Sequence, residues 1–160
     1  RIDENKIGVY GSSAGGHLAG MLSTINEVYS NIGDSLDSLN FKPDFQVLVS
    51  LVVSLVSHYH KGSREALLGN SVSEGLAHQF SIERKVSRDT PPVFGYDNNG
   101  QSVNPLSSIM YYISLKEMSV EASLHIFPKG GHQIGFTNNP GLANLWTILC
   151  EEWLKEMGFL

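Results

Sequence analysis

A serine between small residues stands directly behind a short apolar run. Residues 11–17 read Gly-Ser-Ser-Ala-Gly-Gly-His and follow the apolar residues 7–10. A G-x-S-x-G motif between a strand and a helix places its serine at the tip of a strained turn, with the hydroxyl above the sheet. Ser13 is therefore the candidate nucleophile, and Gly11 and Gly15 would keep strand and helix from clashing. The alternative is a plain tight turn, since glycine- and serine-rich loops contain this pattern by chance.

Two further groups are needed for this chemistry. The backbone N–H of Ala14, at the start of the expected helix, is a candidate donor to an oxyanion. A serine hydroxyl also needs a base that takes its proton. His132 is the best-placed base, because residues 129–132 read Lys-Gly-Gly-His just beyond the last expected strand. The alternative for His132 is a histidine of a surface loop.

The other histidines have structural interpretations. We expect His17 to buttress the turn by hydrogen bonding and His125 to be a structural residue within a strand. His58 and His60 form an H-x-H pattern that could bind a metal ion. No cysteine or carboxylate cluster accompanies that pair, so a solvated loop is the favoured interpretation and no metal is expected.

A carboxylate should hold the imidazole tautomer and stabilise the imidazolium. Asp97 is the acid that follows the third expected strand, and it is the candidate for this role. Residues 97–100 read Asp-Asn-Asn-Gly, which is equally the pattern of a plain turn. The role of Asp97 therefore has two interpretations.

Strand and helix patterns alternate along the chain, which predicts an α/β fold with a parallel sheet of about four strands flanked by helices. The 160 residues fit a single domain. Expected strands cover residues 6–10, 44–56, 93–96 and 122–127, and expected helices cover 14–29, 106–118 and 139–157. Residues 58–86 read as an insertion of short helices with a capping box at 71–74. The expected buried helix faces are Leu18, Met21, Leu22, Ile25 and Val28 in the first helix and Leu142, Leu145, Leu149 and Trp153 in the last.

Composition excludes several classes of function. The formal net charge is −5 with no stripe of Lys or Arg, which argues against a nucleic-acid partner. The longest apolar run, residues 47–56, is broken by serines and is too short to cross a membrane. No phosphate-binding glycine motif is present, and we expect no cofactor. Cys150 reads as a buried packing residue, and nothing in the sequence indicates a compartment.

Several segments resemble one family when taken in order. They are residues 11–19 (Gly-Ser-Ser-Ala-Gly-Gly-His-Leu-Ala), 61–69 (Lys-Gly-Ser-Arg-Glu-Ala-Leu-Leu-Gly), 90–94 (Thr-Pro-Pro-Val-Phe), 111–112 (Tyr-Tyr) and 127–132 (Phe-Pro-Lys-Gly-Gly-His). Together they resemble the α/β-hydrolase esterases related to acetylxylan and feruloyl esterases and to prolyl-oligopeptidase-like hydrolases. The resemblance implies a partial α/β-hydrolase fold over residues 1–160, with Ser13 as nucleophile and His132 as base. It also implies a carboxylic-ester substrate, acetyl or aryl, on a small molecule or a carbohydrate.

The sequence departs from that family in two places. Counting back from Pro105, Gln101 stands where the family has its catalytic acid, and Asp97 stands where it has a histidine. In the family, a His-Gly-Gly oxyanion loop and the first strands precede the strained turn that carries the serine, which is called the nucleophile elbow. We therefore expect this chain to be the later part of a longer protein. These departures support an alternative, a catalytically impaired relative with a binding or structural role. A peptidase of the prolyl-oligopeptidase type is the third and least favoured reading.

The missing first strands also have a structural consequence. The elbow strand, residues 6–10, would lie at an edge of the sheet with unpaired N–H and C=O groups. We therefore expect copies of this chain to associate through that edge.

Overall fold

Four parallel strands form the centre of the molecule. The computed structural model describes residues 2–26, 33, 35–99, 103–132 and 134–160. The strands are β1 (Gly8–Ser12), β2 (Phe45–Val49), β3 (Val93–Asn98) and β4 (Ala122–Phe127), and they lie side by side in the order β1-β2-β3-β4. Every neighbouring pair is parallel. The predicted parallel sheet of four strands is confirmed.

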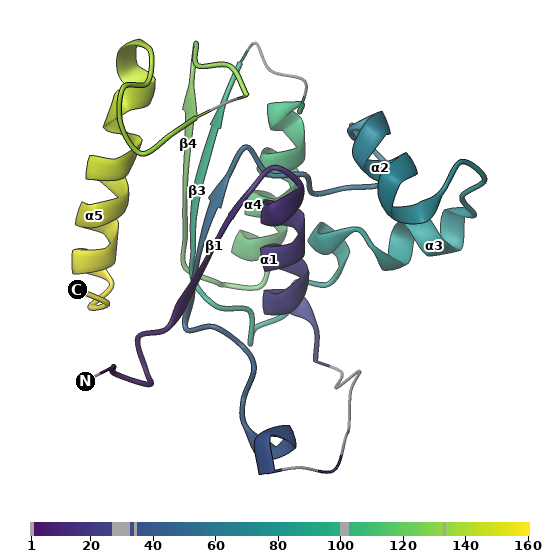
Figure 1. Cartoon of the computed structure of the whole chain (residues 1–160), viewed down its shortest axis with the longest axis horizontal. Helices are drawn as coiled ribbons and strands as arrows, with labels where there is room; N and C mark the ends of the chain where they lie inside the picture. Colours follow the sequence, from purple (N-terminus) through teal and green to yellow (C-terminus); the bar gives the residue numbers. More distant parts are fainter. Residues whose placement is uncertain (1, 27–32, 34, 100–102, 133) are drawn as a thin grey trace.

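Helices cover both faces of this sheet (Figure 1). Helices α1 (Ala14–Thr24) and α4 (Pro105–Glu117) pack on one face, and α5 (Trp146–Glu156) packs on the other. Helices α2 (Lys61–Leu68) and α3 (Glu74–Gln79) lie beyond α1, on the side away from α5. Short 3-10 helices cover Ser35–Ser38, Ile82–Arg84 and Gly141–Leu145.

The central strands are apolar on both faces, as a covered parallel sheet requires. On the α1 and α4 side, Leu48 and Val93 join the core formed with Met21, Tyr111 and Leu115. On the α5 side the core consists of Val47, Val49, Phe94, Tyr96, Ala143, Trp146, Cys150 and Trp153. Alternation along each strand thus divides the core into two layers.

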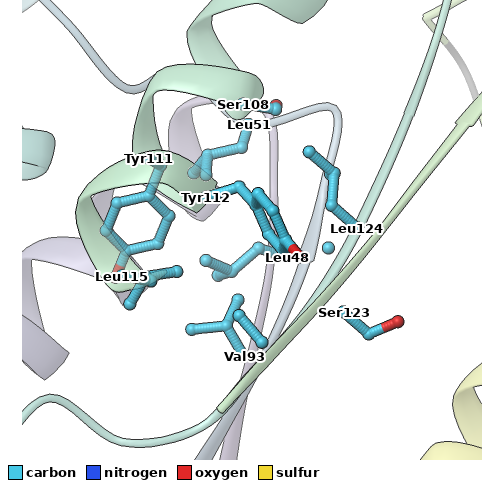
Figure 2. Close-up of a pocket in the computed structure, with 11 residues that line it drawn as sticks. Leu48, Leu51, Val93, Ser108, Tyr111, Tyr112, Leu115, Ser123 and Leu124 are labelled. Carbon is cyan, nitrogen blue, oxygen red and sulfur yellow. The ribbon is translucent and has the colours of Figure 1, made fainter. Parts of the chain in front are cut away.

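Helix α4 packs closely on β3 and β4. Figure 2 shows Tyr111, Tyr112 and Leu115 of this helix over Val93 and Leu124 of the strands. The space left between them is about 10 Å³, which is at the limit for one water molecule. This hollow is part of the core and offers no room for a ligand.

The buried face of α1 differs from the predicted one. Leu18 is 71% exposed and Leu22 is also exposed, whereas Met21 is buried as expected and Ile25 is partly buried. Val28 lies outside the described residues. Small residues face the interior instead: a Cβ on Gly20 would lie 2.6 Å from Ile82 Cδ1. The helix approaches its neighbours so closely that glycine and alanine, not leucine, occupy the contact.

The last helix also differs from its prediction. A 3-10 turn covers Gly141–Leu145 before α5 begins, and Leu142 and Leu145 are exposed. The buried side chains are Trp146, Cys150 and Trp153, so the burial predicted for Cys150 is confirmed. The predicted burial is therefore wrong for Leu142 and Leu145, which lie before α5, and right for Trp153, while Leu149 is partly buried against the same core.

The insertion holds short helices as predicted, but its cap is different. The side chain of Ser73, not Ser71, accepts a hydrogen bond from Leu76 N at 3.2 Å and begins α3. In the described part of the chain, no helix has the length and apolar character that crossing a membrane would need.

Strand β1 lies at one edge of the sheet. Within the described residues it pairs only with β2, and Ile7, just before the strand, and Tyr10, within it, are about half exposed. Such an edge presents backbone groups that another strand can pair with. Association of two copies through β1 stays a prediction.

Candidate active site

Ser13 has the backbone of a strained turn. It connects β1 to α1 with φ 55° and ψ −122°, a conformation that residues with a side chain rarely adopt. Its N–H donates to the carbonyl oxygen of Val49 at 2.9 Å, and its own carbonyl accepts from His17 N at 3.1 Å. These bonds hold the turn between the end of β2 and the first turn of α1.

The two glycines of the motif have different roles. A Cβ on Gly11 would lie 2.4 Å from the carbonyl oxygen of Gly15 and 2.8 Å from Gly16 Cα, both backbone atoms. A Cβ on Gly15 would meet no described atom within 4 Å. The predicted steric role is therefore right for Gly11 and wrong for Gly15, because strand and helix approach each other on the Gly11 side of the turn.

His132 contacts the serine across the carboxyl end of the sheet. Its Nε2 lies 2.9 Å from Ser13 Oγ, within hydrogen-bond distance. The hydroxyl donates to Nε2 when the ring carries its proton on Nδ1. The structure thus brings together the two residues that the sequence singled out as nucleophile and base.

Asn98 holds the loop that carries His132. Its Oδ1 accepts from Gly131 N at 2.8 Å and its Nδ2 donates to the Gly131 carbonyl at 3.0 Å. Gly131 has φ 82°, and a Cβ on Gly130 would lie 2.7 Å from Asn98 Cγ. Farther along, Trp146 Nε1 donates to the Gly135 carbonyl at 3.0 Å. The glycines before His132 therefore allow a close amide clamp.

Sequence reasoning missed this clamp because it placed Asn98 in a turn. In the structure β3 continues to Asn98, which is fully buried. Two sequence features could have indicated the clamp. The pattern of a buried strand leads into the amides Asn98 and Asn99, and a Gly-Gly-His loop follows the next strand.

Asp97 is buried at the end of β3. Its Oδ2 accepts from Ser108 Oγ at 2.5 Å and its Oδ1 accepts from Asn98 N at 2.8 Å. Burial raises the pKa of this carboxyl to about 6. Within the described residues no hydrogen bond joins Asp97 to His132. Gln101, at the family's acid position, lies outside the described residues, and the role of Asp97 as acid stays a prediction.

Ala14 is the first residue of α1 and is exposed. The first N–H groups of a helix have no acceptor inside the helix and point outward at its positive end. Ala14 follows Ser13 directly, so its N–H is one of these groups, and its role as an oxyanion donor stays a prediction.

His17, His125 and His60 make structural contacts. His17 Nε2 lies 2.7 Å from the Phe80 carbonyl, which ties α1 to the segment after α3, and burial lowers the pKa of the His17 ring. His125 Nε2 lies 2.8 Å from Ser123 Oγ. His60 Nδ1 accepts from Ser63 N and begins α2. The described residues hold no group of three side chains that could bind a metal ion.

The glycine geometry predicts opposite outcomes for two alanine substitutions. Gly11→Ala forces a methyl group into backbone and should lower the free energy of unfolding by roughly 3 kcal/mol. In Gly15→Ala the added methyl group meets open space on a helix. This change should leave the free energy of unfolding unchanged or raise it by up to about 1 kcal/mol. Urea denaturation of both variants measures the difference, and equal losses would contradict this geometry.

Asp97 predicts a pH dependence of stability. Its pKa of about 6 exceeds the unfolded value of 3.8, so the native state binds the proton more tightly. The stability that this proton gives is present below about pH 4 and is lost as pH rises through 6. The shift corresponds to roughly 3 kcal/mol. Asparagine carries no titrating proton, so the free energy of unfolding of Asp97→Asn should rise relative to that of the parent chain, by about that amount, between pH 4 and 7. The exposed Asp89→Asn is the control, and parallel pH profiles for all three chains would rule out the effect.

Comparison with known proteins shows the family of this chain. Residues 1–108 match the model of the BD-FAE family. The chain is 31% identical over 163 residues to an acetylxylan esterase of Xylanibacter ruminicola, covering 98% of this chain and 30% of that protein. It is 29% identical over 140 residues to endo-1,4-beta-xylanase B of Butyrivibrio fibrisolvens, and the match covers 86% of this chain and 22% of that protein.

Solved structures show the same fold. An acetyl ester-xyloside bifunctional hydrolase from Caldicellulosiruptor lactoaceticus matches with a TM-score of 0.92 at 38% identity, over 99% of this chain and 59% of that one. The carboxylesterase Cest-2923 from Lactobacillus plantarum matches in fold, with a TM-score of 0.78 at 23% identity. That match covers 99% of this chain and 61% of the other. The chain thus spans about three fifths of these structures and less than a third of the two curated relatives. It belongs to the BD-FAE family and has the α/β-hydrolase fold of these esterases.

Proposed function

We propose that this chain carries the serine–histidine pair of a carboxylic-ester hydrolase. The observation that carries the proposal is the 2.9 Å contact between His132 Nε2 and Ser13 Oγ on a strained turn. A positioned base next to a serine hydroxyl is the arrangement that activates it as a nucleophile. The esterases among its relatives support ester hydrolysis as the reaction.

The reaction would run through an acyl-Ser13 intermediate. Ser13 Oγ attacks the ester carbonyl while His132 takes the hydroxyl proton, and the Ala14 N–H donates to the oxyanion. His132 then returns the proton to the leaving alcohol, which leaves the acyl group on Ser13. Water, deprotonated by His132, attacks the acyl carbonyl, and the carboxylic acid and free serine are released. The route uses no cofactor.

The substrate class is supported by the names of the relatives. One relative is an acetylxylan esterase, and one structural neighbour is an acetyl ester-xyloside bifunctional hydrolase. Acetyl or aryl esters on a carbohydrate or small molecule are therefore the proposed substrates.

Burst kinetics with p-nitrophenyl acetate test the role of Ser13. Release of nitrophenol should show an initial burst, because the acyl group accumulates on the serine before water removes it. Ser13→Ala should lose the burst and reduce turnover by on the order of a thousandfold or more. Ser12→Ala is the matched control on the neighbouring serine, and a burst that persists in Ser13→Ala would refute the role of Ser13.

The alternative function, an impaired hydrolase that binds without turnover, rests on Gln101 at the family's acid position. A neutral amide cannot stabilise an imidazolium, and in serine proteases the Asp-to-Asn change costs about ten-thousandfold in turnover. Gln101→Asp should raise esterase activity strongly if the acid has been lost. Unchanged activity would favour Asp97 or another group as the acid.

Asn98 should act as a positioning residue for His132. Removing both hydrogen bonds to Gly131 lets the histidine loop shift, and a displacement of about 1 Å can cost on the order of a hundredfold in rate. Asn98→Ala should therefore lower kcat about 10- to 100-fold with little change in KM. Asn98→Asp, which keeps the acceptor for Gly131 N, should recover part of the rate. The exposed Asn99→Ala is the control, and a loss confined to KM would contradict a positioning role.

A further inference from the structure

A polar hollow lies on the outer side of α2, in the insertion. Its volume is about 230 Å³, below the roughly 300–1,000 Å³ of pockets for drug-sized ligands, so it has room for one small ring. The helix side of its wall is formed by Lys61, Arg64 and Glu65, and the opposite side includes Asn70 and Val72.

Helix α2 separates this hollow from the candidate active site. Its lining residues on the helix are three and four positions apart, so they share one face. Gly62 and Ala66, on the other face, line a separate hollow together with Ala14, which follows Ser13. The loop that joins α2 to α3 lies on the side away from α1 (Figure 1). A ligand in the polar hollow is therefore at least a helix diameter, roughly 10 Å, away from the nucleophile.

The loop reaches the hollow because α2 ends at a glycine. Gly69 has φ 83°, and its N–H donates to the Glu65 carbonyl at 2.9 Å. This left-handed conformation reverses the chain after the helix, so Asn70 and Val72 return alongside it. The hollow thereby has an amide and an apolar side chain opposite the charges of α2.

Arg64 is the cation of this hollow that has no counter-ion. Its guanidinium carbon lies 4.5 Å from the centre of the Tyr59 ring, a cation–π contact that fixes the guanidinium plane. Lys61 Nζ, by contrast, lies 3.6 Å from Glu65 Oε1. Among the described residues no carboxylate forms an ion pair with Arg64. A positioned, unpaired cation thus lines a hollow in a chain of formal net charge −5.

This combination of groups matches a sugar that carries a carboxylate. The N–H donors of a guanidinium fit both oxygens of a carboxylate, and a guanidinium already ordered by a ring loses less entropy on binding. Asn70 offers an amide donor and acceptor for hydroxyl groups, and Val72 offers apolar surface for the C–H groups of a sugar ring. Inorganic phosphate would use the charge alone.

We propose that this hollow binds a uronic acid residue of an acidic carbohydrate, with the sugar carboxylate on Arg64. The proposal deepens the proposed function and rests on it for the carbohydrate nature of the substrate. Because α2 lies between the hollow and Ser13, the uronic acid is a different sugar residue from the one that carries the ester. The substrate is then an oligosaccharide or polysaccharide with both groups.

Binding of two matched sugars tests this subsite without any turnover. Methyl β-glucuronide and methyl β-glucoside differ only at the sixth carbon, which is a carboxylate in the first and a hydroxymethyl group in the second. Each is titrated into the chain and followed by amide NMR shifts. The glucuronide should bind at least about fivefold more tightly than the glucoside. The shifts should centre on the N–H groups of Gly69 and Asn70.

Four variants separate the positioned guanidinium from general charge. Arg64→Gln should bind the two sugars equally. Arg88→Gln, at an exposed arginine that does not line the hollow, changes the net charge by the same amount and should keep the parent preference. Tyr59→Leu keeps the charge but removes the ring that fixes it, and should lower the preference about two- to fivefold. Tyr59→Phe keeps the ring and should bind as the parent chain does. Far-ultraviolet circular dichroism checks that all four variants fold.

Several outcomes would overturn the subsite. They are equal binding of the two sugars by the parent chain, a preference that survives Arg64→Gln, a preference that is lost in Arg88→Gln, and shifts that centre away from Gly69 and Asn70. Inorganic phosphate that displaces the glucuronide and binds as tightly would make this a general anion site and overturn the sugar assignment.

Failure of the subsite and failure of the proposed function give different results. A chain that hydrolyses no ester but prefers the glucuronide through Arg64 keeps the sugar site and refutes the proposed function. A chain that hydrolyses p-nitrophenyl acetate but shows no preference for the glucuronide keeps the function and refutes the subsite.

Discussion

The hydrogen bond between Ser13 and His132 joins residues 119 positions apart, and the carboxyl edge of the sheet is what brings them together. Ser13 N donates to the Val49 carbonyl at the end of β2, and Ser50 N donates to the Tyr96 carbonyl in β3. Asn98, two residues farther along β3, clamps Gly131. A continuous series of backbone and amide hydrogen bonds therefore runs along the strand ends from the serine to the histidine.

This arrangement explains where the chain tolerates strain. Ser13 and Ser50 both have positive φ, at 55° and 50°, and each directly follows a strand of the sheet. Non-glycine residues hold such conformations only where the surrounding structure fixes them. Here the fixing comes from the neighbouring strand, whose carbonyl takes the N–H of each strained residue. Ser13 is thus positioned by hydrogen bonds of the backbone.

Patterns with a local physical cause were predicted well from the sequence. The four strands and the elbow serine follow from apolar runs and a turn of small residues, and the position of His132 follows from the order of segments along the chain. Burial that depends on how closely two elements pack in space could not be predicted from local sequence patterns. Helix α1 buries glycine and alanine where it lies close to Ile82, so the predicted burial was wrong for Leu18 and Leu22, although it was right for Met21. Asp97 and Asn98 read as a turn, yet they are buried strand residues because β4 and the histidine loop cover them.

Within the described residues, the insertion (residues 58–86) contributes no atom to the hydrogen bonds that join Ser13 to His132. It is attached to α1 through the contact between His17 and the Phe80 carbonyl and through the apolar side chains around it. The hydrogen bonds that hold Ser13 beside His132 and the helices of the insertion are therefore separable parts of the chain. The helical segment can change in length or sequence while the strand ends keep the two side chains in register.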